Sequence, residues 1–233
     1  MKIWKQKRLT GKYGKVQEIV ERELSCSAHD MDHVMRVYNM AINIAKHEKN
    51  VDLDILKMAT LLHDIARVKE DNDKTGNICH AEESARMCVP ILKKIGYSIR
   101  EIEKVKHCIS SHRYKTNNKP ETIEAKILFD ADKLDSLGAI VILRAGMWMG
   151  RHGCSIFPKM ELEKYAKLNL VGGVLTGRIK DKSLHNIFYE HEIKGKKLIS
   201  KMHTKEATRI SKERFKYMDM FLNRIEKEAE GIL

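Results

Sequence analysis

A histidine and an aspartate stand side by side at His63 and Asp64, within the apolar run of residues 59–66. Burying an imidazole and a carboxylate is unfavourable unless a partner satisfies both groups. A metal ion would satisfy both at once, because imidazole nitrogens and carboxylate oxygens are common ligands of divalent ions. We therefore expect His63 and Asp64 to bind a metal, and they are the first candidates for catalytic residues.

Residues with the same ligand chemistry occur before and after this pair. His33 opens an amphipathic segment, and Asp132 lies in a segment whose other positions are mostly apolar. Together with the pair, they give a mixed nitrogen and oxygen ligand set rather than a thiolate-only site. Such a set suits a divalent ion such as Mn, Co, Ni, Fe, Mg or Zn. Four protein ligands leave positions open for water and substrate, as in catalytic metal sites.

Three basic residues lie within about one helical turn of a predicted ligand in the sequence and could bind phosphate. They are Arg36, Arg67 and Lys133. Positive groups offset the charge that develops on a leaving oxygen, and arginine can bind phosphate through two parallel hydrogen bonds. The alternative for each is a surface charge or an ion pair. We expect Asp130 and Asp135 to orient ligands or to pair with Arg144 rather than to bind metal.

The elements that must position these residues are predicted to be helices. Apolar residues recur every three or four positions after His33 and along several later segments. Further helices are expected at residues 53–66, 81–95, 99–111, 121–137 and 138–149, near 160–168, and in a long final helix capped by Thr204. Alternating patterns typical of strands are nearly absent, so we predict an all-α fold.

Composition places the chain among ordinary globular proteins. It has 233 residues with 42% hydrophobic and 33% charged residues, and we expect one domain over residues 1–233. Within it we predict a core at about 25–145, an irregular insert at 146–182, and C-terminal helices at 183–230. No apolar run is long enough to span a bilayer, and the basic N-terminus lacks the apolar core of a signal peptide. Five cysteines without a CxxC motif indicate reduced thiols, so we expect a cytoplasmic protein.

The formal net charge of +12 favours polyanionic partners. A phosphorylated small molecule is one such partner, and nucleic acid is another. The first fifteen residues hold six Lys or Arg and no acid, which is typical of a solvated basic arm. Aromatic residues are only 6% and scattered, so no aromatic-rich RNA-binding motif supports the nucleic-acid alternative.

Four matched segments make the sequence resemble the HD-domain metal-dependent phosphohydrolases. His33, His63-Asp64 and Asp132 follow the order of that family's H…HD…D motif, and residues 130–140 are similar to the DADxLDxxGA segment of one subgroup. Residues 202–222 also resemble that subgroup's tail. The resemblance implies an HD-like helical bundle around a buried metal site, with His33, His63, Asp64 and Asp132 as ligands.

Two further histidines, His80 and His112, raise the question of a second metal. Some members of the family use histidines in these intervals for a second ion, and the alternative is one metal with histidines that support it or bind substrate. Many relatives have glycine and then a basic residue after HD-Ile. This chain has Ala66 in place of the glycine and keeps the basic residue as Arg67.

The resemblance implies divalent-metal-dependent hydrolysis of phosphate esters or phosphoanhydrides, most simply in nucleotides. The alternatives are a nucleic-acid-associated binding module, or a phosphodiesterase acting on RNA or cyclic nucleotides. Residues 113–116 lack the Gly-Tyr-Pro expected after His112 in the cyclic-dinucleotide branch. Apolar positions near Trp148 and in the C-terminal helix leave a homodimer open.

Overall fold

The computed structural model describes residues 8–24, 31–113 and 118–233, and within them it contains helices and no strand. The one β-type pairing among these residues is an isolated bridge between Leu170 and Ile179. The predicted all-α fold is therefore confirmed. Part of the basic N-terminal arm, residues 1–7, and residues 114–117 lie outside the described residues. The chain divides into two compact units, Met1–Asp132 and Lys133–Leu233, and the expected single domain stays a prediction.

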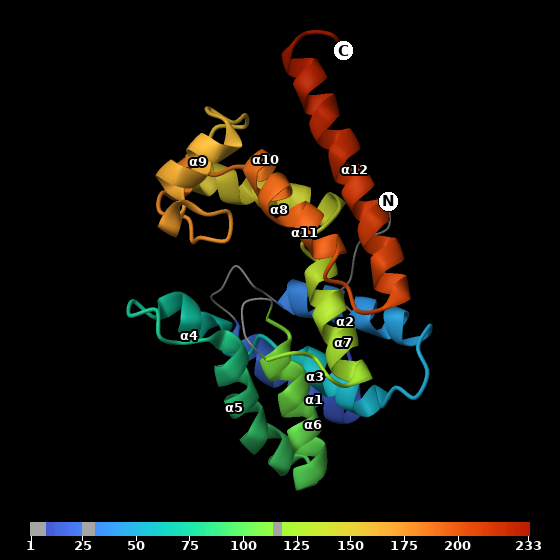
Figure 1. The fold of residues 1–233 in the computed structure, drawn as a ribbon. Coiled ribbons are helices and arrows are strands. Elements are labelled where there is room, and N and C mark those ends of the chain that lie inside the picture. Colours follow the sequence, from blue (N-terminus) through green and yellow to red (C-terminus); the bar gives the residue numbers. More distant parts are fainter. Residues whose placement is uncertain (1–7, 25–30, 114–117) are drawn as a thin grey trace. The chain divides into compact units, whose positions relative to one another are not determined.

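The first unit is built around one central helix, α3 (Leu53–Leu62), which contacts α1, α2, α5 and α6 (Figure 1). Seven of its ten residues are buried, because its apolar side chains point to all sides. The helices of this unit are α1 (Gly11–Glu23), α2 (Met31–Ala45), α3, α4 (Arg67–Asn72), α5 (His80–Lys94), α6 (Ile99–Ser111) and most of α7 (Ile123–Leu134).

Helix α3 is shorter than expected, and this changes the setting of the predicted ligands. The sequence predicted a helix to residue 66, but α3 ends at Leu62 and residues 63–66 form a turn. In this turn Arg67 N donates to Asp64 O at 2.8 Å, and Ala66 N donates to the Ser84 hydroxyl of α5 at 3.0 Å. The polar turn therefore lies at the end of an apolar helix, with its backbone held by a second helix.

Three other helices of this unit begin and end close to the predicted residues, whereas α1 and α4 were not predicted. Helix α6 covers the predicted range and starts with a capping box between Ser98 and Glu101. Helix α5 begins at His80, one residue before the prediction. Helix α7 begins at Ile123 and ends at Leu134, inside the predicted 121–137.

The second unit is also helical. Its core includes Tyr165, stacked on Tyr189 with ring centroids 3.8 Å apart. The predicted cap of the last helix is present, since the Thr204 hydroxyl accepts from Ala207 N at 3.3 Å. The elements are α8 (Ala139–His152), α9 (Leu162–Asn169), the 3-10 turns η1 (Val171–Gly173) and η2 (Lys182–Leu184), α10 (Ile187–Glu190), the π-helical turn η3 (His191–Gly195), α11 (Lys196–Ile199) and α12 (Lys205–Ala229).

The glycine of the DADxLDxxGA-like segment has a clear structural role. Gly138 precedes α8 with φ +92°, a conformation that residues with a side chain rarely adopt. A Cβ placed there would lie 3.1 Å from Arg214 Cγ. Arg214 in turn donates to Leu134 O at 2.6 Å. Gly138 therefore allows both the turn into α8 and the close approach of α12.

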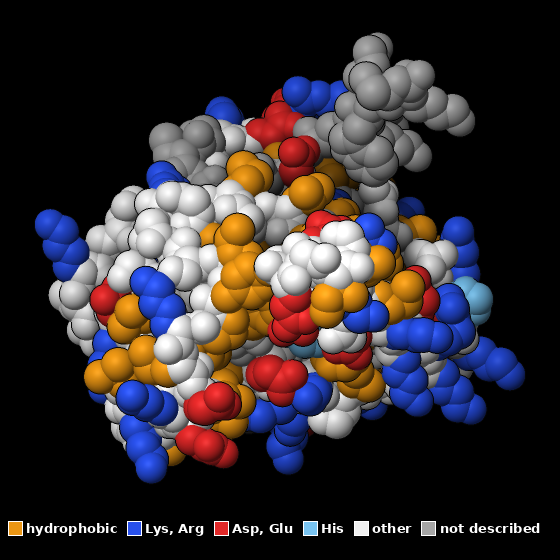
Figure 2. All heavy atoms as spheres, turned by 90° about the horizontal axis from the view of Figure 1, so that it is seen from above, with side chains coloured by type: hydrophobic (Ala, Val, Ile, Leu, Met, Phe, Trp, Pro, Cys, Tyr) orange, Lys and Arg blue, Asp and Glu red, His pale blue; other side chains and the backbone are white. Residues whose placement is uncertain are grey.

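Figure 2 shows where charged and apolar side chains lie on one face of the protein. Lys and Arg side chains lie mostly around the margin of this view, and acidic and hydrophobic side chains lie nearer its middle. Among the described residues, no helix combines the length and apolar character that crossing a membrane requires.

Candidate metal centre

Four predicted ligands converge within the first unit. His33 of α2 has its Nε2 3.4 Å from His63 Nε2, 3.7 Å from Asp64 Oδ2 and 3.5 Å from Asp132 Oδ1 of α7. His63 Nε2 lies 3.8 Å from the same Asp64 oxygen. The two histidines and Asp64 are buried, and Asp132 is partly buried. We name this group of atoms the first subsite.

The two remaining candidate histidines meet the other oxygen of Asp64. Asp64 Oδ1 is 3.4 Å from His80 Nε2 and 3.5 Å from His112 Nε2, and these two nitrogens are 3.2 Å apart. Both histidines are at most 5% exposed. We name this group the second subsite. Asp64 thus faces one subsite with each carboxylate oxygen, as a carboxylate between two metal ions does.

The ends of two helices set the proton positions of two histidines. His63 and His112 directly follow α3 and α6, where the last carbonyl groups of a helix lack helical partners. His63 Nδ1 donates to Thr60 O at 2.7 Å, and His112 Nδ1 donates to Ile109 O at 2.6 Å. Since a neutral imidazole has one N–H, each Nε2 carries a lone pair that points to the cluster.

His80 also carries its proton on Nδ1, but here the acceptor is a side chain rather than a backbone carbonyl. Its Nδ1 donates to Glu70 Oε2 at 2.7 Å, so its Nε2 is also the acceptor nitrogen. Glu70 accepts further hydrogen bonds from Arg67 Nη1 at 2.9 Å and from Arg113 Nη1 at 2.7 Å. Glu70 was not predicted as a functional residue from the sequence, although it lies one helical turn after Arg67.

The electrostatics favour a cluster that is ready to bind a cation. Burial lowers the pKa of His63 and of His80 to about 4, so both rings are neutral at pH 7. Burial opposes the charge of Asp64, but the positive charge that His63, His112 and His33 would carry when protonated holds the pKa of this carboxyl well below its ordinary value. The interior therefore holds a carboxylate among imidazole lone pairs.

The residues present fit a divalent ion. Within the described part of the chain, Asp64 Oδ1 is one of three buried side-chain polar atoms that make no hydrogen bond. Such an atom is rare in folded proteins, and an ion that the structure does not contain is one explanation. In two groups, one of His33, His63 and Asp64 and one of Asp64, His80 and His112, ligand atoms lie within 4.8 Å of one another and could hold a metal.

The other predicted residues lie in varied settings. Asp135 accepts from Arg144 Nη1 at 2.9 Å, one of the two alternatives expected for it. Asp130 is fully buried, whereas Arg36 and Lys133 are half-buried. Arg67 directs Nη1 to Glu70, on the Nδ1 side of His80. Their predicted roles in binding phosphate or orienting ligands stay predictions.

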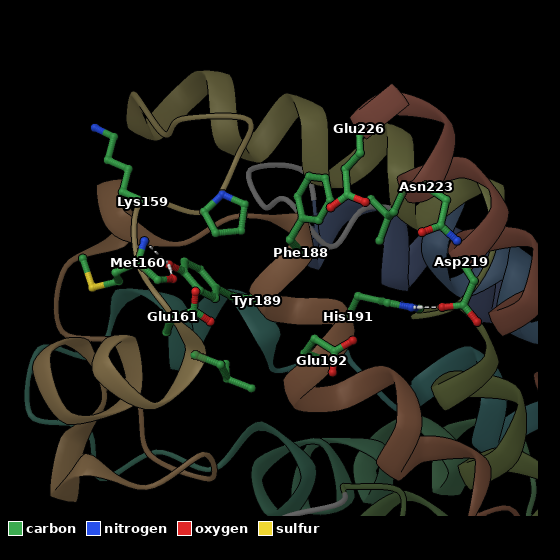
Figure 3. Close-up of a pocket in the computed structure, with 13 residues that line it drawn as sticks. Lys159, Met160, Glu161, Phe188, Tyr189, His191, Glu192, Asp219, Asn223 and Glu226 are labelled. Atoms are coloured by element: carbon green, nitrogen blue, oxygen red, sulfur yellow. Dashed lines mark hydrogen bonds and ion pairs between the residues drawn. The ribbon is translucent and has the colours of Figure 1, made fainter. Parts of the chain in front are cut away.

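A separate cavity of about 540 Å³ lies within the second unit (Figure 3). His191 of the π-helical turn points to Asp219 of α12 there, with Nε2 and Oδ1 2.6 Å apart. Phe188 and Tyr189 line the cavity, but no predicted ligand does. The chemistry expected from the sequence therefore belongs to the buried cluster and not to this cavity.

The protein is an all-α protein with a buried His/Asp cluster that could hold a divalent ion. Residues 31–137 match the family model described as HD domain, and this range includes every residue of both subsites. The resemblance to HD-domain proteins that the sequence predicted is confirmed over these residues.

Two relatives cover nearly the whole chain. Bacillus subtilis YpgQ, an uncharacterized protein, is 29% identical over 93% of this chain and 91% of its own. Its crystal structure in complex with ADP has a TM-score of 0.61, covering 93% of this chain and 94% of that one at 26% identity. An HD-superfamily hydrolase from Bacillus thuringiensis has a TM-score of 0.67 at 27% identity, covering 94% of this chain and 97% of its own.

Proposed function

We propose that this chain is a divalent-metal-dependent phosphohydrolase that acts on nucleotides through the two subsites sharing Asp64. One observation carries the proposal: three imidazoles donate from Nδ1 to fixed acceptors and present Nε2 lone pairs to one buried carboxylate. Acceptor atoms packed without a donor between them repel one another, and a cation removes that repulsion.

The chain's own residues define what each subsite supplies. His33, His63, Asp64 and Asp132 would hold one ion, and Asp64, His80 and His112 would hold a second. Bound divalent ions polarise a phosphoryl oxygen and lower the pKa of water toward ~7. Burial of His63 and His80 keeps these two rings unprotonated near neutral pH, so protons do not compete with the cation there.

Two observations favour a nucleotide as substrate. The relative YpgQ has been crystallised with ADP, and this chain aligns with that structure over 93% of its length. The net charge of +12 attracts polyanions such as nucleoside diphosphates and triphosphates. Arg36, one helical turn after His33, and Lys133, which follows Asp132, are the residues we propose for phosphate contact.

The test is a nucleotide panel with chelator-treated protein to which Mn, Co, Ni, Mg or Zn is added back singly. We expect metal-dependent release of phosphate or pyrophosphate from at least one nucleoside triphosphate or diphosphate. Identification of the product shows which bond is cleaved. Metal binding without turnover, together with salt-dependent RNA binding, would instead favour a nucleic-acid-associated module.

A further inference from the structure

Histidine 80 differs from the other ligands of the second subsite in its place on a helix. His112 directly follows α6, where the Ile109 carbonyl at the end of the helix accepts its Nδ1 proton. His80 is instead the first residue of α5, where the main chain offers N–H groups rather than carbonyls. His80 therefore needs an acceptor from outside its own helix.

Glu70 of α4 supplies this acceptor. Its Oε2 lies 2.7 Å from His80 Nδ1, and its Oε1 accepts from the His80 backbone N–H at 3.4 Å. An ionised carboxylate only accepts hydrogen bonds, so Nδ1 is the nitrogen that carries the proton.

The two arginines hold Glu70 in this orientation. Arg113 Nη1 binds Oε1 at 2.7 Å, and Arg67 Nη1 binds Oε2 at 2.9 Å. Arg67 Nη1 also lies 2.9 Å from His80 Nδ1. Because a guanidinium only donates, the carboxylate is the common acceptor for both groups.

We propose that Glu70 is a positioning residue that fixes His80 in its Nδ1–H tautomer and thereby controls metal binding at the second subsite. Without this carboxylate, the His80 proton is free to move to Nε2. There it would face Asp64 Oδ1, 3.4 Å away, and occupy the direction in which a metal must bind. The metal part of this inference rests on the proposed function, whereas the tautomer part does not.

The test compares Glu70→Gln with a matched control, Glu83→Gln. Glu83 also lies between two cations, Lys69 at 2.9 Å and Arg86 at 2.7 Å, but it contacts no predicted ligand. Nitrogen-15 NMR of the metal-free proteins reports which ring nitrogen of each histidine carries the proton. Mn²⁺ titration of the same proteins reports the number of ions bound and the Kd of each.

We expect the His80 proton to move from Nδ1 to Nε2 in Glu70→Ala, to move only in part in Glu70→Gln, whose amide oxygen still accepts, and to stay on Nδ1 in Glu83→Gln. The Kd of the second Mn²⁺ should rise about 10- to 100-fold in Glu70→Gln, the usual effect of losing a group that orients a ligand. The Kd of the first Mn²⁺ should change little. Glu70→Ala provides a second variant, because Arg67 and Arg113 are partly exposed and can turn to water.

Two results would overturn the inference. One is an unchanged His80 tautomer in both Glu70 variants, and the other is equal weakening of both Mn²⁺ ions. A wild-type chain that binds a single ion would contradict the two-subsite part of the proposed function. The NMR result would still decide the role of Glu70, so the two failures are distinguishable.

Discussion

Replacing Asp64 with asparagine should separate the stability of the metal-free protein from its stabilisation by metal. The carboxylate lies 3.4–3.8 Å from four imidazole nitrogens, and its Oδ1 makes no hydrogen bond in the described structure. An asparagine amide has nearly the same shape, and its NH₂ group donates to imidazole lone pairs. We therefore expect the melting temperature of metal-free Asp64→Asn to equal or exceed that of the wild type.

Metal should stabilise the two proteins very differently. At a free Mn²⁺ concentration one hundred times Kd, a single bound ion adds about 2.7 kcal/mol to the stability of the folded state. For a chain of this size ~1 kcal/mol corresponds to about 2–4 °C, so the wild-type Tm should rise by about 5–11 °C. A 100-fold weaker Kd in Asp64→Asn would leave about 0.4 kcal/mol at the same concentration, or less than ~2 °C.

The assay is thermal unfolding of chelator-treated protein with and without added Mn²⁺. Asp32→Asn is the matched control, because Asp32 precedes His33 but its side chain is exposed. The control should keep the wild-type rise in Tm. An equal rise in Asp64→Asn would refute the assignment of Asp64 as the ligand shared by both subsites.

Three further predictions concern thiols, backbone and pH. Burial raises the pKa of Cys88 and of Cys108 to about 12, so both should resist thiol reagents at pH 8 until the protein unfolds, as mass spectrometry of alkylated peptides would show. Gly138→Ala should lower the free energy of unfolding by ~1–3 kcal/mol, because Gly138 has a positive φ. Gly146→Ala should leave that free energy unchanged or raise it, because a Cβ at Gly146 would meet open space. Denaturant titrations measure both. Burial opposes the charge of Glu190, but its hydrogen bonds lower its pKa from 4.5 to about 2. Its contribution to the free energy of unfolding is therefore present above pH 4.5 and is lost as the pH falls through 2. In Glu190→Gln the free energy of unfolding should fall less steeply over this pH range.

The helical fold and the first four candidate ligands could be read from the sequence because local patterns determine them. An apolar period of 3.6 residues predicts helices, and a His-Asp pair in an apolar run must have a partner. The end of α3 was harder to predict. Apolar residues continue to Ala66, while the helix stops at Leu62, because His63 and Ser84 hold the turn through hydrogen bonds to the backbone.

Glu70 shows what the sequence alone did not reveal. It lies in a strongly charged stretch, residues 69–74, which is typical of a solvated surface. Its contact with His80 depends on how residues 73–79 return the chain to the cluster, where Asp73 accepts from Ile78 N at 2.8 Å. Arg67 was a candidate for phosphate binding, although its i, i+3 spacing to Glu70 also allowed the ion pair that the structure contains.

The central claim is most directly tested by measuring Mn²⁺-stimulated nucleotide hydrolysis by wild-type protein and His63→Ala, with helix content monitored by circular dichroism. His63 is fully buried in the first subsite and directly precedes the shared Asp64. We predict that wild-type protein turns over a nucleotide only with metal and that His63→Ala loses this activity while keeping its helix content. Equal metal-stimulated activity in a folded His63→Ala variant, or full wild-type activity in excess chelator, would contradict the account.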